Sequence, residues 1–204
     1  MRIGFLGAGN LAQTLGKAFI AAGHQIVLSN SRGPETLASL LEQLGPHATA
    51  TTPAQLKDET ELVILAMQWH QREEALDGLP DWDGHVVVDP LNNRQGPRPD
   101  EVIDIGDRTS SELVALLLPG ARVVKAFNHA PIPTFADPQG GAMFLCGDDQ
   151  SAKRIVASLI SDIGGTPIDT GDLVTGGRLQ GAGHRLAGHG RLLPVETAQR
   201  LINA

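Results

Sequence analysis

The chain has 204 residues, with 16 Lys or Arg against 23 Asp or Glu, so its formal net charge at pH 7 is −7. This acidic balance argues against a nucleic-acid binder, whose phosphate contacts need a clustered basic face. No apolar run approaches the ~20 residues of a membrane-spanning helix, and the apolar start at residues 3–6 is too short for a signal peptide. The single cysteine, Cys146, excludes intrachain disulfides and fits a reducing compartment. We expect a soluble, cytoplasmic protein with neither nucleic acid nor membrane as a partner.

Strand-like and helix-like stretches alternate along the first part of the chain, which is typical of a parallel sheet covered by helices on both faces. Several of the strand candidates are almost entirely apolar, as strands buried on both faces should be. The expected strands are residues 2–7, 25–29, 47–51, 62–66, 85–89 and 122–126.

The stretches between these strands carry helix signals. Leu11, Leu15 and Phe19 recur at every fourth residue, and Pro34 suits the first position of a second helix. Thr109 and Glu112 have the spacing of a capping box ahead of a further helix.

Beyond Asn128 the pattern is less regular. We expect strands at 142–146 and 167–170, a helix between them, a glycine-rich stretch at 171–190 and a final helix at 195–202. The sequence therefore predicts a doubly wound α/β domain of the dinucleotide-binding type at 1–128 and a small C-terminal α/β segment at 129–204 that completes the substrate cleft.

The strongest local signal is the run Gly7-Ala8-Gly9-Asn10-Leu11-Ala12, a G-x-G-x-x-A pattern directly after the first strand and at the start of a helix. Gly7 permits a tight turn, Gly9 lets the backbone approach a pyrophosphate, and Ala12 lets the helix pack close to the sheet. The unpaired N–H groups at the helix start would bind the pyrophosphate. The alternative is a glycine turn without a ligand.

The end of the second strand indicates which nicotinamide cofactor binds. NAD enzymes usually carry Asp or Glu there, whereas this chain has Asn30-Ser31-Arg32. A guanidinium binds a 2′-phosphate through charge-assisted hydrogen bonds, so Ser31 and Arg32 indicate NADP. The alternative is that Arg32 is only a solvated turn residue.

Three later turns should line the nicotinamide side, because ligands on such sheets lie beyond the carboxyl ends of the strands. Trp69 either packs on a ring or is an aromatic at the rim of the core. Asn128 is our candidate catalytic residue, as a donor to a carbonyl of the substrate or cofactor, although it can equally cap its own strand. The residues of these turns that we assign to cofactor binding are Ala66, Met67, Gln68, Trp69, Pro90, Leu91, Ala126 and Asn128.

With these turns located, the sequence resembles the family of NADP oxidoreductases that depend on coenzyme F-420 (F420), a deazaflavin hydride carrier. The resemblance spans roughly residues 1–180 and implies a Rossmann-like NADP domain with a small C-terminal segment as one wall of a cleft. The implied reaction is reversible hydride transfer between NADPH and the deazaflavin. The matching motifs are residues 1–11, Ser31-Arg32, Trp69, and residues 123–128, 146–149 and 169–173.

Two departures from the family lie on the acceptor side. Archaeal members have histidine where this chain has Asn128, and residues 176–190 are unusually rich in glycine. The acceptor is therefore open: besides F420, a free flavin, a ferric complex or an imine remains possible, as does a regulatory NADP-binding module without turnover. We expect residues 171–190 to form a lid or a partner surface, and a homodimer to complete the cleft.

Other reactive side chains give weaker signals. His184 and His189 have no nearby carboxylate or thiolate to complete a ligand set, so we expect no metal site. His129 is a minor candidate for a proton donor, and Cys146 lies in an apolar strand where an inert thiol is expected.

Overall fold

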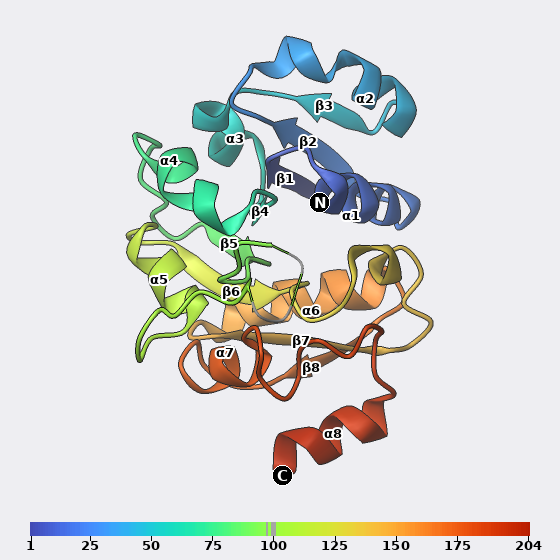
Figure 1. The fold of residues 1–204 in the computed structure, drawn as a ribbon. Helices are drawn as coiled ribbons and strands as arrows, with labels where there is room; N and C mark the ends of the chain where they lie inside the picture. Colours follow the sequence, from blue (N-terminus) through green and yellow to red (C-terminus); the bar gives the residue numbers. More distant parts are fainter. Residues whose placement is uncertain (97, 99–100) are drawn as a thin grey trace.

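The computed structural model describes residues 1–96, 98 and 101–204. Within this part, eight strands form one sheet with helices on both faces (Figure 1). The strands are β1 (Arg2–Leu6), β2 (Gln25–Ser29), β3 (Ala48–Ala50), β4 (Leu62–Leu65), β5 (Val86–Asp89), β6 (Arg122–Ala126), β7 (Ala142–Gly147) and β8 (Thr166–Asp169). Every strand expected from the sequence is present, with each end within one residue of the expected position.

The order of the strands is β3-β2-β1-β4-β5-β6-β7-β8. From β3 to β6 all pairs are parallel, and the order reverses direction between β1 and β4. Strand β7 runs antiparallel to β6, with Lys125 opposite Cys146, and β8 is parallel to β7. Residues 129–204 therefore extend the same sheet beyond residue 128 instead of forming a second sheet.

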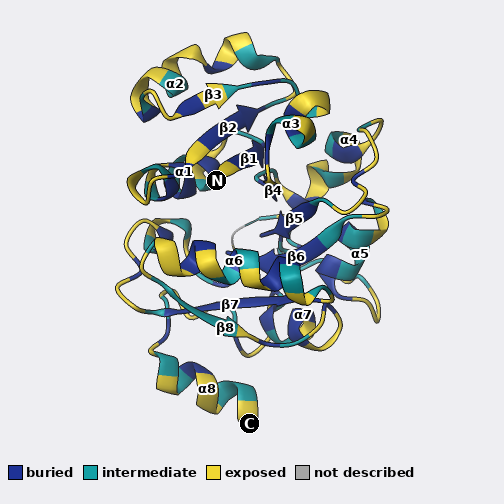
Figure 2. Cartoon of the chain, turned by 180° about the vertical axis from the view of Figure 1, so that it is seen from behind, coloured by how far each residue is buried: buried dark blue, intermediate teal, exposed yellow. Residues whose placement is uncertain are grey.

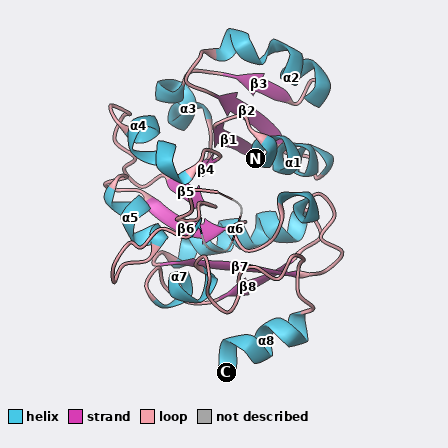
Figure 3. Cartoon of the chain, viewed as in Figure 1, coloured by secondary structure: helices cyan, strands magenta, loops and turns pink. Residues whose placement is uncertain are grey.

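The helices lie in two layers (Figure 3). On one face are α1 (Asn10–Ala21), α2 (Ala38–Leu44) and α6 (Gln150–Asp162), and on the other are α3 (Pro53–Glu59), α4 (Arg72–Leu76), α5 (Ser110–Leu116) and α7 (Thr175–Gln180). The helix expected from Pro34 begins as a short 3-10 helix, Pro34–Leu37, before α2. Two further 3-10 helices, Trp69–Gln71 and Ile132–Phe135, follow β4 and β6. Each helix in the two layers covers part of the apolar sheet.

Alternation along the strands builds both cores. In β4, Leu62 and Ile64 pack with α1, while Val63 and Leu65 face the opposite layer, and all four are fully buried. The strands are accordingly buried throughout the centre of the molecule (Figure 2). This is the arrangement expected of parallel strands covered on both faces.

The C-terminal segment ends in one more helix, and two glycines of its glycine-rich stretch are closely packed. Gly176 and Gly177 of α7 lie so close to Cys146 and Thr109 that a Cβ on either would require movement. Helix α8 (Val195–Asn203) ends the chain at the margin of the molecule (Figure 1). None of the helices in the described residues is both long and apolar enough to cross a membrane.

Candidate functional site

The glycine turn lies where the strand order reverses, at the carboxyl ends of β1 and β4, which is where open α/β sheets bind ligands. Gly7 has φ of 111° and donates its N–H to the carbonyl of Ser29 at 2.9 Å. A Cβ on Gly7 would overlap the carbonyl oxygen of Ala66. Only glycine meets both the steric and the torsional demand of this turn.

Gly9 is the residue that leaves space for a ligand. It is the N-cap of α1, and a Cβ placed on it would meet nothing within 4 Å. No side chain caps the twelve-residue helix α1, so its first N–H groups have no side-chain acceptor there. This cradle fits the pyrophosphate of a dinucleotide, because such N–H groups and the helix dipole both favour an anion.

Two adjoining cavities run along this edge of the sheet, and they share Gly9, Ala66, Met67 and Gln68. The first, which we call the β2-side cavity, has a volume of about 440 Å³. Its lining residues are Leu6, Gly7, Ala8, Gly9, Asn30, Ser31, Arg32, Pro53, Ala66, Met67, Gln68, Gln71, Glu74 and Ala75.

The second, the β5-side cavity, has a volume of about 530 Å³. Among the described residues, its lining combines apolar side chains, amides and a single charged side chain, that of Arg94. The lining residues are Gly9, Asn10, Leu11, Ala66, Met67, Gln68, Trp69, Pro90, Leu91, Asn92, Arg94, Gly96, Phe127, Asn128, Ala130 and Ile132.

Arg32 lies at the exposed end of the β2-side cavity. Its backbone N–H donates to Oδ1 of Asn30 at 3.0 Å, and the Asn30 amide nitrogen donates to Oγ1 of Thr36 at 2.9 Å. Among the described residues, no carboxylate oxygen lies within 4 Å of the Arg32 guanidinium. The turn is thus fixed by Asn30, while the cation is available to a phosphate.

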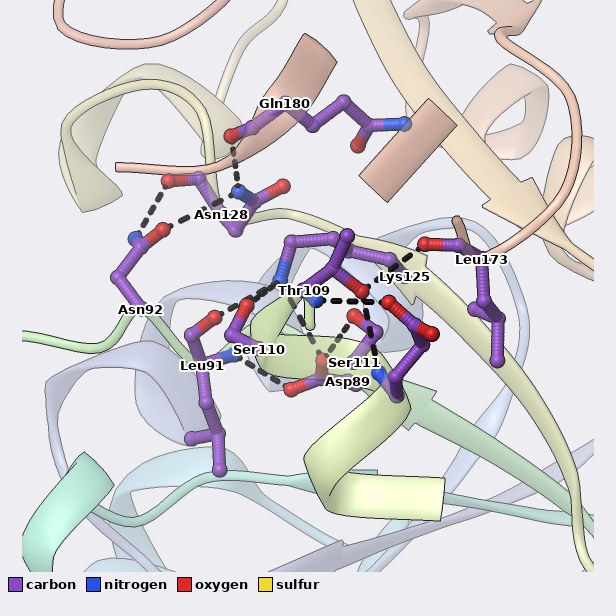
Figure 4. A network of polar contacts seen from close by, with 11 residues as sticks. Asp89, Leu91, Asn92, Thr109, Ser110, Ser111, Lys125, Asn128, Leu173 and Gln180 are labelled. Carbon is purple, nitrogen blue, oxygen red and sulfur yellow. Dashed lines mark hydrogen bonds and ion pairs between the residues drawn. The ribbon is translucent and has the colours of Figure 1, made fainter. Parts of the chain in front are cut away.

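A buried ion pair supports the β5-side cavity from below (Figure 4). The side chains of Asp89 and Lys125 are both 0% exposed, with Nζ and Oδ2 separated by 3.3 Å. Lys125 Nζ also donates to the carbonyl of Leu91 at 2.9 Å and to Oγ of Ser110 at 3.1 Å, and Asp89 accepts from the N–H of Leu91 and the hydroxyl of Ser111. Because both ends of the pair hold Leu91, they fix the turn that lines the cavity.

Asn128 also belongs to this supporting network. Its amide nitrogen donates to the carbonyl of Gln180 at 2.9 Å and to Oδ1 of Asn92 at 3.2 Å. Asn92 donates in return to the carbonyl of Asn128 at 2.8 Å. The Asn128 amide nitrogen thus has protein acceptors for both of its hydrogens, so the group facing no protein partner is Oδ1, and not the donor expected from the sequence.

The residue before Asn128 makes its position possible. Phe127 has φ of 60°, a left-handed conformation that is uncommon for an aromatic residue. Its ring packs edge-on against Phe19 and Phe135, with centroids 6.2 and 5.8 Å away. This packing holds the chain reversal that follows β6.

Not every expected residue faces the site. Ala126 is fully buried in the core and lines neither cavity. Trp69 lines the β5-side cavity but is only 4% exposed, and the Arg72 guanidinium lies 3.9 Å from the centre of its ring. The structure therefore places Trp69 as an aromatic at the rim of the core.

The other reactive side chains lie away from the cavities. His129 packs between Phe135 and Phe144, and burial lowers its pKa to about 4, so it is neutral and does not reach the site as a proton donor. Burial raises the pKa of the Cys146 thiol to about 12, which makes it unreactive.

Some residues that line the two cavities were not predicted from the sequence. Gln71 ends the 3-10 helix after β4, Glu74 and Ala75 lie on α4, and Arg94 follows β5 on an irregular segment. A rule that extends the strand-end turns by several residues would have included Gln71 and Arg94. No local pattern distinguishes them from solvated surface residues.

The reversal of strand order, the glycine turn and the open start of α1 together define a dinucleotide-binding protein of the Rossmann type. The comparison with protein families gives a closer similarity. The family model described as NADP oxidoreductase, coenzyme F420-dependent, matches residues 2–93 of this chain.

Individual proteins are similar to larger parts of the chain than this family model. The structure of a hypothetical protein, SMa0349 of Sinorhizobium meliloti, is 34% identical, with a TM-score of 0.84 and 95% of each chain covered. Metalloreductase STEAP3 of Rattus norvegicus is 29% identical over 178 residues, which are 85% of this chain and 34% of that protein. The F420-dependent NADP reductase of Methanocaldococcus jannaschii is 29% identical over 123 residues, covering 56% of this chain and 55% of the relative. The chain thus spans only about a third and about half of these two curated relatives.

Proposed function

We propose that this chain binds NADP(H) along the two cavities and transfers hydride between NADPH and a flat ring acceptor, of which the deazaflavin F420 is the first candidate. The observation that carries the proposal is the presence, in one cavity, of an arginine without a carboxylate partner among the described residues and of a helix start without a side-chain cap. Arg32 and Gly9 both line the β2-side cavity, which suits a cofactor with a phosphate at each place. The match of residues 2–93 to a family of NADP oxidoreductases supports NADP as this cofactor.

Each part of the chain has a distinct task in this proposal. Gly9 and the first turn of α1 would hold the pyrophosphate, and Asn30, Ser31 and Arg32 the 2′-phosphate. The turns at Met67 and Leu91 would position the nicotinamide in the β5-side cavity.

NADPH, when bound, supplies a hydride from its dihydronicotinamide ring and leaves as NADP⁺, while the acceptor gains two electrons. Transfer between stacked rings depends on orientation and the exclusion of water more than on an acid–base residue. The β5-side cavity provides apolar walls at Met67, Leu91 and Phe127, and no carboxylate or imidazole is found among the described side chains that line it.

The experiment is anaerobic oxidation of NADPH with a panel of acceptors: F420, FMN, a ferric chelate and a cyclic imine. We expect NADPH to be oxidised when F420 or FMN is the acceptor. The loss of NADPH fluorescence measures this oxidation. Similarity to a metalloreductase makes the ferric chelate the next candidate. Tight binding of NADPH without turnover of any acceptor would instead establish a regulatory NADP-binding module.

A matched pair of variants tests the cofactor site itself. Gly9→Val places a branched side chain in the open cradle and should abolish measurable NADPH binding. Gly16→Ala, on the same helix, is the control, because its Cβ would meet only Ile26 at 3.8 Å. If the two variants bound NADPH with equal affinity, the assignment of the pyrophosphate to the start of α1 would be wrong.

We also propose a homodimer, because the C-terminal segment is too short to enclose an acceptor alone. Light scattering at the concentrations used for the activity assay tests this. A fully active monomer would refute it.

A further inference from the structure

We propose that Arg94 selects acceptors that carry an anionic group, a phosphate or a carboxylate, attached to the ring that receives the hydride. The inference rests on the proposed function and narrows its substrate class. It comes from the electrostatics of the β5-side cavity and from the way in which Arg94 is held there.

Arg94 is the only charged side chain among the described residues that line this cavity. The polar side chains that share the lining, such as Gln68 and Asn92, are neutral. The net charge of the whole chain is −7, so an anionic molecule is repelled at long range. A single cation inside the cavity gives such a molecule one favourable place to bind.

The guanidinium of Arg94 has little compensation within the protein. The residue is half-buried, and no carboxylate oxygen of the described residues lies within 4 Å of its guanidinium nitrogens. The Nη1 atom of Arg94 donates to the carbonyl of Arg98 at 3.2 Å. A guanidinium has five N–H donors in a fixed fork, so this cation retains the donors that a planar anionic group requires.

The backbone around Arg94 fixes its position. Arg94 forms an antiparallel bridge with Val102. Next to it, Asn93 accepts from the N–H of Ile103 at 2.7 Å and donates from its side chain to the carbonyl of Ile103 at 2.6 Å. The backbone next to Arg94 is therefore held by two hydrogen bonds between Asn93 and Ile103. A fixed backbone at the start of the Arg94 side chain lowers the conformational entropy that is lost when an anion binds.

The phosphates of the cofactor have other binding groups. The pyrophosphate is expected at Gly9, at the junction of the two cavities, and the 2′-phosphate at Arg32, which lines only the β2-side cavity. Arg94 lines only the β5-side cavity, on the segment that follows β5. The acceptor is thus the remaining partner for its charge.

The test compares two flavins that share one ring system, riboflavin, whose tail is neutral, and FMN, whose tail ends in a phosphate. In the wild type we expect a higher kcat/KM for FMN than for riboflavin. Arg94→Gln should lower kcat/KM for FMN by about 10- to 100-fold, the range for a hydrogen bond to a charged group, and that for riboflavin by less than about 2-fold. Arg154→Gln, an exposed arginine on α6, is the control and should change neither.

Other outcomes separate this inference from the proposed function. Equal losses for the two flavins, or a weaker Kd for NADPH in Arg94→Gln, would overturn the role assigned to Arg94. If the wild type turns over neither flavin, the proposed hydride transfer to flavins fails, and binding of each flavin to the NADP⁺-loaded protein, measured by flavin fluorescence, decides the inference alone. Tighter binding of FMN that is lost in Arg94→Gln would support it, and equal binding of both flavins would refute it.

Discussion

We call the buried network around Asp89 and Lys125 the floor of the site, and the residues that line its two cavities the rim. The floor and the rim use cations in opposite ways. On the floor, Lys125 is fully buried and has an anion, a hydroxyl and a carbonyl as partners. On the rim, Arg32 and Arg94 line cavities and have no carboxylate within 4 Å among the described residues. A partnered, dry cation fixes the geometry of the protein, whereas an unpartnered cation beside a cavity is available to a ligand. Substitutions on the floor should therefore change stability, and substitutions on the rim should change recognition.

The largest effect should come from Lys125→Met. This change leaves the Asp89 carboxylate buried without its counter-ion, and such losses typically destabilise a protein by about 3–5 kcal/mol. Urea denaturation measures the change in the free energy of unfolding. Lys17→Met, at an exposed position of α1, should change it by less than about 0.5 kcal/mol. A loss below about 1 kcal/mol for Lys125→Met would mean that the floor is not the rigid support that we describe.

His129 is a contrasting case, because it is a polar residue that is buried against the rings of Phe135 and Phe144. Burial lowers its pKa from 6.5 to about 4, so the unfolded chain binds more protons between these values. The contribution of His129 to stability is complete above pH 6.5 and declines as the pH falls towards 4, by about 3 kcal/mol in all.

Unfolding of the wild type and of His129→Phe across this pH range measures that contribution. The variant should lose part of the slope. Burial also lowers the pKa of His85, but His85 is present in both proteins and cancels in the difference. Identical slopes would contradict the prediction.

On the rim, Arg32→Ala should weaken binding of NADPH by about 1–3 kcal/mol and leave binding of NADH nearly unchanged. Calorimetric titration with both nucleotides tests this, and the free energy of unfolding should stay constant because Arg32 is exposed. Arg32→Lys keeps the charge but lacks the planar guanidinium. Its affinity for NADPH should therefore lie between that of the wild type and that of Arg32→Ala. An equal loss for NADPH and NADH would remove Arg32 from the phosphate site.

The smallest effect concerns Thr109, which joins the floor to the C-terminal segment. Its side chain caps α5 by accepting from the N–H of Glu112, and its hydroxyl donates to the carbonyl of Leu173 at 3.0 Å. Thr109→Ala should cost about 1 kcal/mol of stability. Thr134→Ala, which loses only an exposed bond to the carbonyl of Pro131, should cost less. Equal costs would indicate that the cap and the bond to Leu173 together contribute no more than an exposed hydrogen bond.

Local signals predicted much of this molecule. The apolar runs located all eight strands, and the spacing of Thr109 and Glu112 predicted a capping box that the structure contains. Gly7 and Gly9 lie at the carboxyl ends of β1 and β4 because the chemistry of such a turn is written in adjacent residues. These features depend on neighbours along the chain, so one sequence is enough to reveal them.

Other features depended on residues far apart in the sequence. The antiparallel placement of β7 joined residues 129–204 to the same sheet, and α7 packed Gly176 and Gly177 against Cys146 and Thr109. The partners of Asn128, at positions 92 and 180, likewise could not be read from its own surroundings.

The sequence by itself determined the strands, the glycine turn and the residues that indicate NADP, because periodicity, steric demand and charge act between near neighbours. Only the tertiary structure decided which cations are neutralised and which are free. Lys125 and Arg94 are both cations near strand ends. Lys125 is buried against Asp89, which gives it a partner. Arg94 lies on a segment that is held by the hydrogen bond from Asn93 to Ile103, and it lines a cavity. The ion pair between Lys125 and Asp89 joins residues that are 36 positions apart, so it exists only in the folded chain.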